Sequence, residues 1–192
     1  MASRRQVLGG LGAITILGLV GCGRGQEQAS ACTPLPFVAG DECSVCGMYI
    51  TEHSGPKGQV CLRGGRGIAK FCSTTDLFAW LLQPEARALA DAVYVHDLGQ
   101  TDWAQPHDTA LIDGRAAWYV IGHPLLGAMG AALAPFAERA AAEDFAAQYD
   151  GELLALDQID LEALNVMRAG GAPGAGGSVD WDALPPRGGA DS

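Results

Sequence analysis

Between residues 48 and 71, apolar and β-branched residues fall in short runs rather than at helical spacing. The runs cover residues 48–51, 60–63 and 68–71, and Gly-Pro and Gly-Gly pairs separate them. Short runs of this kind, bounded by turn residues, are typical of β-strands. We therefore expect three strands joined by tight turns.

The spacing changes to that of a helix after residue 72. Ser73 is a suitable N-cap with Asp76 three residues later, a shorter relative of the capping box. Apolar residues then recur at helical spacing: Leu77, Phe78, Leu81 and Leu82. Pro84 interrupts this helix, residues 85–91 add a turn or two, and residues 93–96 return as a strand.

The second half repeats this order more loosely. We expect a strand over residues 117–121, a helix over 135–149 that ends at a left-handed Gly151, and a strand over 153–156. Residues 160–168 are expected to form a closing helix. The order of elements predicts an α+β fold and indicates a weak internal duplication.

The N-terminus has the pattern of an export signal. Residues 7–20 are almost wholly apolar and contain no acidic residue, but the run is too short to span a membrane comfortably. Arg4 and Arg5 precede it in an order that resembles the twin-arginine consensus, although paired arginines also occur in ordinary signal peptides. We assign residues 1–21 to the signal.

Cys22 ends the apolar run in the order Leu-Val-Gly-Cys, which looks like a bacterial lipobox. The alternative is ordinary cleavage that leaves a free thiol. Two or more acyl chains on Cys22 would anchor a protein stably, since each buried methylene contributes about 0.8 kcal/mol. We expect a protein that sits on a membrane, on the periplasmic or outer side of the cell, without crossing it.

Composition sets the remaining domain boundaries. Residues 22–40 are expected to form a tether, residues 41–168 the folded body, and residues 169–192 a disordered tail rich in Gly, Ala and Pro. Removal of the signal changes the formal net charge from −10 to −12, because it takes away two arginines and no acid. Such a charge argues against nucleic acid as a partner and suits a cation or a basic protein surface.

Six cysteines lie at positions 22, 32, 43, 46, 61 and 72. Without Cys22 an odd number remains, so at least one thiol is free, bound to something, or paired with another molecule. Cys43 and Cys46 form a C-x-x-C pair with three interpretations. A redox dithiol normally opens a helix and a zinc site needs further close ligands, whereas Cu(I) accepts two or three soft sulfur ligands.

Met48 favours copper among these interpretations. A methionine is most often a core residue. Here Gly47 lets the backbone turn tightly between Cys46 and Met48, so that a thiolate and a thioether can reach the same ion.

The run Cys46-Gly47-Met48, followed by the sequence of residues 52–59, resembles the signature of the NosL family of lipoprotein copper chaperones. The resemblance implies a fold of two ββαβ-type units, over residues 41–104 and 105–168, similar to part of organomercurial lyase. It also implies one Cu(I) held by Cys46, Met48 and Met129. Cys43 and His53 are secondary candidates.

The resemblance further implies a carrier rather than an enzyme. The recipient would be apo nitrous oxide reductase, an enzyme whose catalytic centre, once assembled, is a copper-sulfide cluster. Copper would reach it through the NosD, NosF and NosY ABC-type complex. The alternatives are a thiol-disulfide oxidoreductase that uses Cys43 and Cys46, or a heavy-metal scavenger or sensor without a dedicated recipient. The sequence leaves open whether Cys43, Cys61 and Cys72 are ligands, disulfides or free thiols.

Overall fold

The computed structural model describes residues 32–168. The predicted export signal, the lipid-attachment residue Cys22 and the predicted tail after residue 168 lie outside this range. Within residues 32–168, every helix is too short or too polar to cross a membrane.

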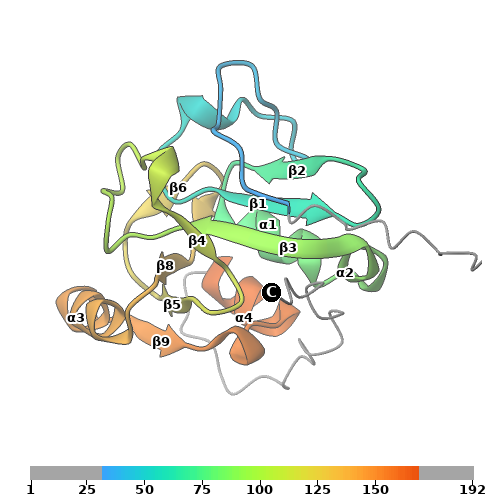
Figure 1. The fold of residues 1–192 in the computed structure, drawn as a ribbon. Coiled ribbons are helices and arrows are strands. Elements are labelled where there is room, and N and C mark those ends of the chain that lie inside the picture. The colour runs from blue at the N-terminus through green and yellow to red at the C-terminus, as the bar shows by residue number, and fades with distance from the viewer. Residues whose placement is uncertain (1–31, 169–192) are drawn as a thin grey trace, which may run out of the picture.

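The first sheet has four antiparallel strands in the order β2-β1-β3-β4. Its strands are β1 (Gly58–Leu62), β2 (Ile68–Phe71), β3 (Ala90–His96) and β4 (Leu111–Asp113). Two helices connect β2 to β3, namely α1 (Thr74–Leu81) and α2 (Pro84–Leu89). Figure 1 shows both helices lying against one side of this sheet.

The second sheet has three antiparallel strands in the order β8-β5-β9. Its strands are β5 (Trp118–Ile121), β8 (Ala134–Phe136) and β9 (Glu152–Leu154), and helix α3 (Arg139–Tyr149) connects the last two. Between β5 and β8 the chain forms a small hairpin of β6 (Leu126–Gly127) and β7 (Gly130–Ala131). Three short 3-10 helices (Ile50–Glu52, Asp108–Ala110, Leu156–Gln158) and the closing helix α4 (Leu161–Arg168) complete the described chain.

The two halves share one topology. In the order of the chain, β1, β2, α1 and β3 correspond to β5, β8, α3 and β9, and the first strand of each set is bonded to both of its other strands. The predicted α+β class with two ββαβ-type units is therefore confirmed.

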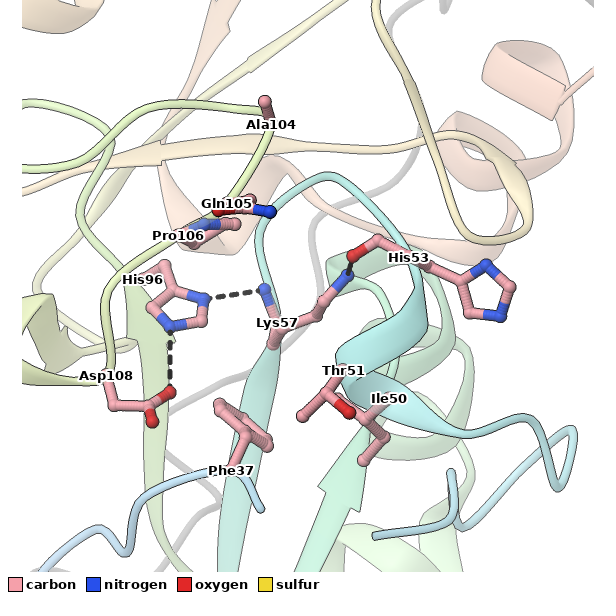
Figure 2. Close-up of a pocket in the computed structure, with 10 residues that line it drawn as sticks. All are labelled: Phe37, Ile50, Thr51, His53, Lys57, His96, Ala104, Gln105, Pro106 and Asp108. Atoms are coloured by element: carbon pink, nitrogen blue, oxygen red, sulfur yellow. Dashed lines mark hydrogen bonds and ion pairs between the residues drawn. The ribbon is translucent and has the colours of Figure 1, made fainter. Parts of the chain in front are cut away.

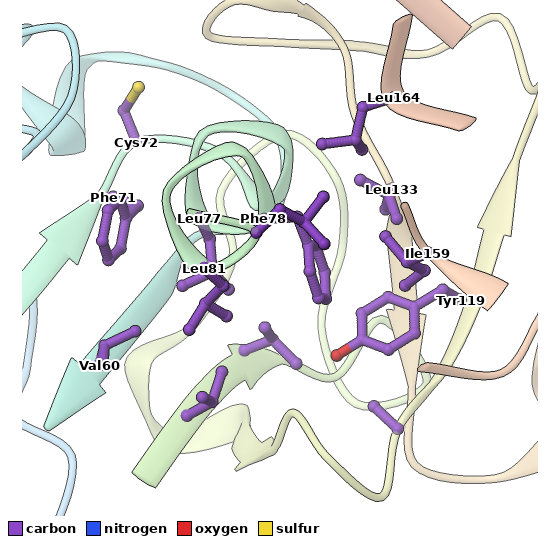
Figure 3. Close-up of a cluster of buried hydrophobic side chains, with 14 of the residues drawn as sticks. Val60, Phe71, Cys72, Leu77, Phe78, Leu81, Tyr119, Leu133, Ile159 and Leu164 are labelled. Carbon is purple, nitrogen blue, oxygen red and sulfur yellow. The ribbon is translucent and has the colours of Figure 1, made fainter. Parts of the chain in front are cut away.

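Helix α1 joins the two units through the main core. Its residues Leu77, Phe78 and Leu81 are fully or almost fully buried, and they share one apolar cluster with side chains of both sheets (Figure 3). The ring of Phe78 meets that of Tyr119 edge to face, with centroids 5.0 Å apart. As predicted, Ser73 caps the helix: its hydroxyl accepts a hydrogen bond from the backbone N–H of Asp76 at 3.1 Å.

Three local predictions were wrong. Residues 48–51 do not form a strand, because only Tyr49 pairs, through an isolated bridge with Glu42, and a 3-10 helix follows at once. Residues 135–136 belong to strand β8 and not to a helix. Pro135 is tolerated there because β8 is an edge strand, where a missing N–H costs no ladder bond.

The third wrong prediction concerns the end of α3. The left-handed position falls on Asp150, with φ 54°, and not on Gly151. An aspartate tolerates this conformation better than most residues. Gly151 is required for a different reason, since a Cβ there would lie 2.7 Å from Val120 Cγ1 and 2.8 Å from the Ile121 carbonyl oxygen.

Candidate metal site

The Cys-Gly-Met motif lies in a tight loop rather than at the start of a strand. The backbone N–H of Cys43 donates to the Met48 carbonyl, and the N–H of Gly47 donates to the Cys43 carbonyl, both at 2.9 Å. Gly47 has φ 72°, a conformation that side chains rarely adopt. These bonds close residues 43–48 into one fixed loop that carries Cys43, Cys46 and Met48.

Strand β2 brings a third cysteine to this loop. The backbone N–H of Ser44 donates to the carbonyl of Lys70 in β2 at 2.9 Å, and Cys72 follows directly after the last residue of that strand. In Figure 3 the sulfur of Cys72 points away from the apolar side chains around Phe71 and Leu77. The Cys72 sulfur points toward the loop instead, where it lies close to the sulfur of Cys46.

The result is a cluster of three thiols and one carboxylate. Cys46 Sγ lies 3.4 Å from Cys72 Sγ, and Asp76 Oδ2 lies 3.4 Å from Cys72 Sγ and 3.7 Å from Cys43 Sγ. One ligand atom from each of these four residues lies within 4.8 Å of all the others. Across residues 32–168 no other group of three or more His, Cys, Asp or Glu side chains converges in this way.

Cys43, Cys72 and Asp76 are buried, whereas Cys46 is half-buried at the surface end of the cluster. Such a set of donors suits a soft ion such as Cu(I), and three thiolates with a carboxylate also satisfy the tetrahedral preference of Zn(II). The second close set of ligands that the sequence failed to show is therefore present in space, because Cys72 and Asp76 approach the C-x-x-C pair.

Neighbouring groups separate the acidities of the thiols. The hydrogen bond from Cys72, together with backbone N–H groups of the loop, lowers the pKa of Cys43 to about 4. The same hydrogen bond, with burial, raises the pKa of Cys72 above the ordinary value for a thiol. Burial also raises the pKa of Cys46 and of Asp76. Cys43 is therefore the most acidic of the three thiols, whereas Cys72 retains its proton more strongly than an ordinary thiol.

The two methionines of the sequence prediction lie in two different segments. Met48 is half-buried in the closed loop, and Met129 is exposed in the turn between β6 and β7. Two threonines at the start of α1 hold this hairpin in place: Thr75 Oγ1 donates to the Ala131 carbonyl at 2.8 Å, and Thr74 Oγ1 donates to the Leu133 carbonyl at 2.7 Å. The Met129 hairpin is thus fixed to the same end of α1 that carries Asp76.

The segment that follows the motif also contacts this hairpin. Ser54 Oγ and Trp103 Nε1 both donate to the Leu126 carbonyl, at 3.3 and 3.0 Å. Gly55, with φ 84°, packs so closely that a Cβ on it would lie 2.9 Å from Gly127 Cα. The Cys46 loop, the residues after it and the Met129 turn therefore form one connected surface.

The histidines lie apart from the cluster. His53 lines a cavity of about 200 Å³ next to the loop, and Figure 2 shows its ring turned away from Lys57. His96 faces the same cavity, and its Nδ1 accepts a hydrogen bond from the backbone N–H of Lys57 at 2.9 Å. The neutral ring therefore carries its proton on Nε2, so neither nitrogen has a free lone pair for a metal.

Cys61 is not part of the site. It forms a disulfide with Cys32, while Cys43, Cys46 and Cys72 are free. This agrees with the odd number of cysteines that remains when Cys22 is set aside. The sequence pointed to Cys43 and Cys46 and left the role of Cys72 open, but it did not indicate Asp76 as a member of the cluster. The available signal was the predicted N-cap at Ser73, which puts Cys72 immediately before the first turn of a helix and Asp76 inside it.

Comparison with known proteins gives consistent results. The model of the NosL family matches residues 34–164. A protein of Stutzerimonas stutzeri named copper-binding lipoprotein NosL is 46% identical over 150 residues, which cover 78% of each chain. A protein of the same name from Achromobacter cycloclastes is 37% identical over 134 residues, covering 68% of this chain and 69% of that one.

A solved structure agrees with the fold. The crystal structure of the copper chaperone NosL from Shewanella denitrificans superimposes with a TM-score of 0.65 at 40% sequence identity. The match covers 67% of this chain and 96% of that one.

Proposed function

Because the chain belongs to the NosL family, we propose that it is an exported, lipid-anchored carrier of Cu(I) that supplies copper for the copper-sulfide centre of nitrous oxide reductase. The relatives that share the family are named as copper-binding lipoproteins and as a copper chaperone, and none of these names is that of an enzyme. The oxidation state, the recipient and the anchor are part of the proposal.

The observation that carries this proposal is the convergence of sulfur atoms around Cys46. A half-buried thiol with two buried thiols within 4.8 Å suits a soft monovalent cation, because thiolates prefer soft ions over harder ones. We propose Cys46 as the central thiolate, Met48 and Met129 as thioether ligands, and Cys43 as a further thiolate. His53 is a weaker candidate, since it lies outside the cluster of convergent groups.

The surface around Cys46 suits transfer of the ion to another protein. Large apolar side chains stand exposed on the two segments that flank the site: Val45, Tyr49, Leu126 and Met129. Exposed apolar residues grouped near a site favour docking of a partner. Within a docked complex, a partner's ligands can bind the ion before the exposed thioether of Met129 leaves it, and no acid or base is required.

The disulfide adds a constraint on where this surface can reach. Cys32 is bonded to Cys61 in β1, so the proposed lipid at Cys22 lies ten positions along the chain from a fixed point of the body. A chain of that length spans at most about 35 Å when fully extended. The proposed anchor would therefore hold the copper site close to the membrane, where a membrane complex such as NosD, NosF and NosY could receive the ion.

A transfer experiment tests the function. The chain is loaded with one equivalent of Cu(I) and mixed with apo nitrous oxide reductase, with and without membranes that contain the NosD, NosF and NosY complex. We expect copper to reach the reductase only when the complex is present, measured as copper bound to the reisolated reductase, and the spectrum of the copper-sulfide centre to return when a sulfide source is also supplied. Cys46→Ser should fail to deliver, whereas Met167→Leu, a volume-conserving change of a core methionine, should deliver normally.

Two results would contradict the proposal. Binding of no Cu(I) by the reduced chain would remove copper carriage altogether. Binding without transfer under any of these conditions would favour the scavenger. The oxidoreductase alternative predicts catalytic reduction of insulin by Cys43 and Cys46, and those two residues lie in a loop rather than at the helix N-terminus where a redox pair normally lies.

A further inference from the structure

We propose that the thiol cluster is also a redox site, in which Cys46 and Cys72 join in a disulfide when an incoming disulfide oxidises the protein. The two sulfur atoms are 3.4 Å apart, and a disulfide bond is about 2.05 Å long, so closure requires a movement of little more than about 1.4 Å. Cys46 is flanked by exposed Val45 and Gly47, which offer little packing resistance to such a shift.

Exposure assigns a role to each thiol. Cys72 is fully buried and Cys43 is 4% exposed, so a second molecule cannot reach them. Cys46 is half-buried and lies at the surface. The incoming disulfide therefore meets Cys46 first, and Cys72 acts afterwards from inside the protein.

The reaction runs in two exchange steps. The partly exposed Cys46 thiol first loses its proton to solvent, and the resulting thiolate attacks one sulfur of the incoming disulfide. The S–S bond of that disulfide breaks and releases one thiolate, and a mixed disulfide remains on Cys46. The Cys72 sulfur then attacks Cys46 Sγ, and the second thiolate leaves. In sum, the two cysteines lose two electrons and two protons, and the incoming disulfide is reduced to two thiols.

A proton acceptor for the second step is in place. Asp76 Oδ2 lies 3.4 Å from Cys72 Sγ, inside the buried end of the cluster. The Cys72 thiol can pass its proton to this carboxylate as its sulfur attacks. Formation of the Cys32–Cys61 disulfide in the same chain indicates that its cysteines meet oxidising conditions during maturation.

Oxidation and metal binding then exclude each other, and this consequence rests on the proposed function. A Cys46–Cys72 disulfide removes the central Cys46 thiolate from the proposed ligand set and links it to the neighbouring sulfur of Cys72. A dithiol on the same side of the membrane as this protein must therefore reduce the disulfide before copper can bind. This places a thiol-reducing reaction before copper delivery.

The test uses the full chain, reduced and metal-free, treated with oxidised glutathione and then analysed by peptide mapping under non-reducing conditions. We expect a Cys46–Cys72 link without retained glutathione. Cys72→Ser should stop after the first step and keep glutathione on Cys46. Cys43→Ser should still form the link, and Cys46→Ser should take up no glutathione in the cluster.

A wild-type protein that retains glutathione on Cys46, or that links Cys43 to Cys46, would overturn the proposal whatever the variants do. A parallel sample with one equivalent of Cu(I) separates this question from the proposed function. If the link forms equally fast with copper, the redox proposal stands and copper binding at this site fails. If copper protects Cys46 from glutathione but no Cys46–Cys72 link forms without copper, then copper binding at this site stands and the redox proposal fails.

Discussion

The hydroxyl of Thr75 donates a hydrogen bond to the carbonyl of Ala131 at 2.8 Å, although 56 residues separate them in the sequence. Thr75 lies next to Asp76 of the thiol cluster, and Ala131 lies two residues after Met129. This bond fixes the relation between the cysteines and a methionine that belongs to the other half of the fold.

The first prediction ranks the sulfur ligands by charge. Cys46 supplies a thiolate that neutralises the cation, so Cys46→Ser should abolish useful Cu(I) binding. Met48 and Met129 supply neutral thioethers, and each Met→Leu change should weaken binding roughly 10- to 100-fold or more, at least the typical cost of losing a supporting residue at a metal site. Affinity should also fall as the pH drops, because each thiol must lose its proton before its sulfur binds the ion, whereas a thioether has no proton to lose.

Competition with a Cu(I) chelator at two pH values measures this ranking. Met167→Leu is the matched control, since Met167 is 4% exposed in α4 and belongs to the apolar core. If Met129→Leu binds like the parent protein, Met129 is a docking residue and the remaining ligands are to be sought at Cys43, Cys72 or His53.

The second prediction concerns the close contact of Gly55 with the hairpin. Gly55→Ala places a methyl group 2.9 Å from Gly127 Cα and also strains a backbone with φ 84°. Gly65 has a similar φ of 69°, but the methyl group of Gly65→Ala would have no neighbour within 4 Å. Each substitution should cost about 1–3 kcal/mol for the backbone conformation, and Gly55→Ala should cost more through the clash.

Denaturant unfolding of both variants gives the comparison. Gly55→Ala should also weaken Cu(I) binding, because it displaces the hairpin that carries Met129, and Gly65→Ala should not. Equal stabilities and equal copper affinities for the two variants would show that the contact with Gly127 has no energetic role.

Local sequence signals predicted much of the fold. Strand β2 and the Ser73-capped helix α1 lie where the apolar spacing and the capping residues indicated, because both depend on neighbours within a few residues. Strand β8 was missed because Pro135 and Phe136 adjoin a helical run, and only pairing with β5 makes them a strand. The three-residue strand β4 was missed because its pairing with β3 is also nonlocal.

The candidate site shows the same division. The loop over residues 43–48 was recognisable from its spacing, since Gly47 permits the turn. Cys72 and Asp76 enter the cluster only through the pairing of the loop with β2 and through the first turn of α1. A count of cysteines required an unpaired thiol, but it could not tell that Cys32 pairs with Cys61 and leaves the other three together.

The third prediction separates the anchor from the site. Cys22→Ser should release the protein from membranes and leave Cu(I) affinity unchanged, because the disulfide of Cys32 isolates the body from changes nearer the N-terminus. Cell fractionation followed by copper titration measures both properties. Cys72→Ser, which alters a cysteine remote from the anchor in the sequence, should stay in the membrane fraction. A Cys22→Ser protein that also stays there would point to an uncleaved signal as the anchor.

The last prediction is that acid destabilises the fold through His96. This side chain is 1% exposed, and burial, together with the positive charges of Lys57 and His107, lowers its pKa to about 3. Protonation would need a second proton on Nδ1, which already accepts a hydrogen bond from the backbone N–H of Lys57. In the charged ring the Nδ1–H would face the Lys57 N–H, and this hydrogen bond would be lost. The Asp108 carboxylate lies 3.8 Å from Nε2, within the distance of an ion pair but beyond that of a hydrogen bond, so it offsets only part of this loss.

The sign of the effect follows from the two pKa values. The unfolded chain binds a proton at His96 near the ordinary pKa of 6.5, whereas the folded chain does so only near 3, so the unfolded state is favoured as the pH falls between them. The contribution of His96 to stability is complete above about pH 6.5, and about 2 kcal/mol of it should be lost between pH 7 and pH 5. His96→Asn keeps an acceptor for the Lys57 N–H but has no proton to gain, so its unfolding free energy should fall less over the same interval. Urea unfolding of both proteins at pH 7 and pH 5 measures this difference, and equal losses in the two proteins would show that His96 does not control the acid sensitivity of the fold.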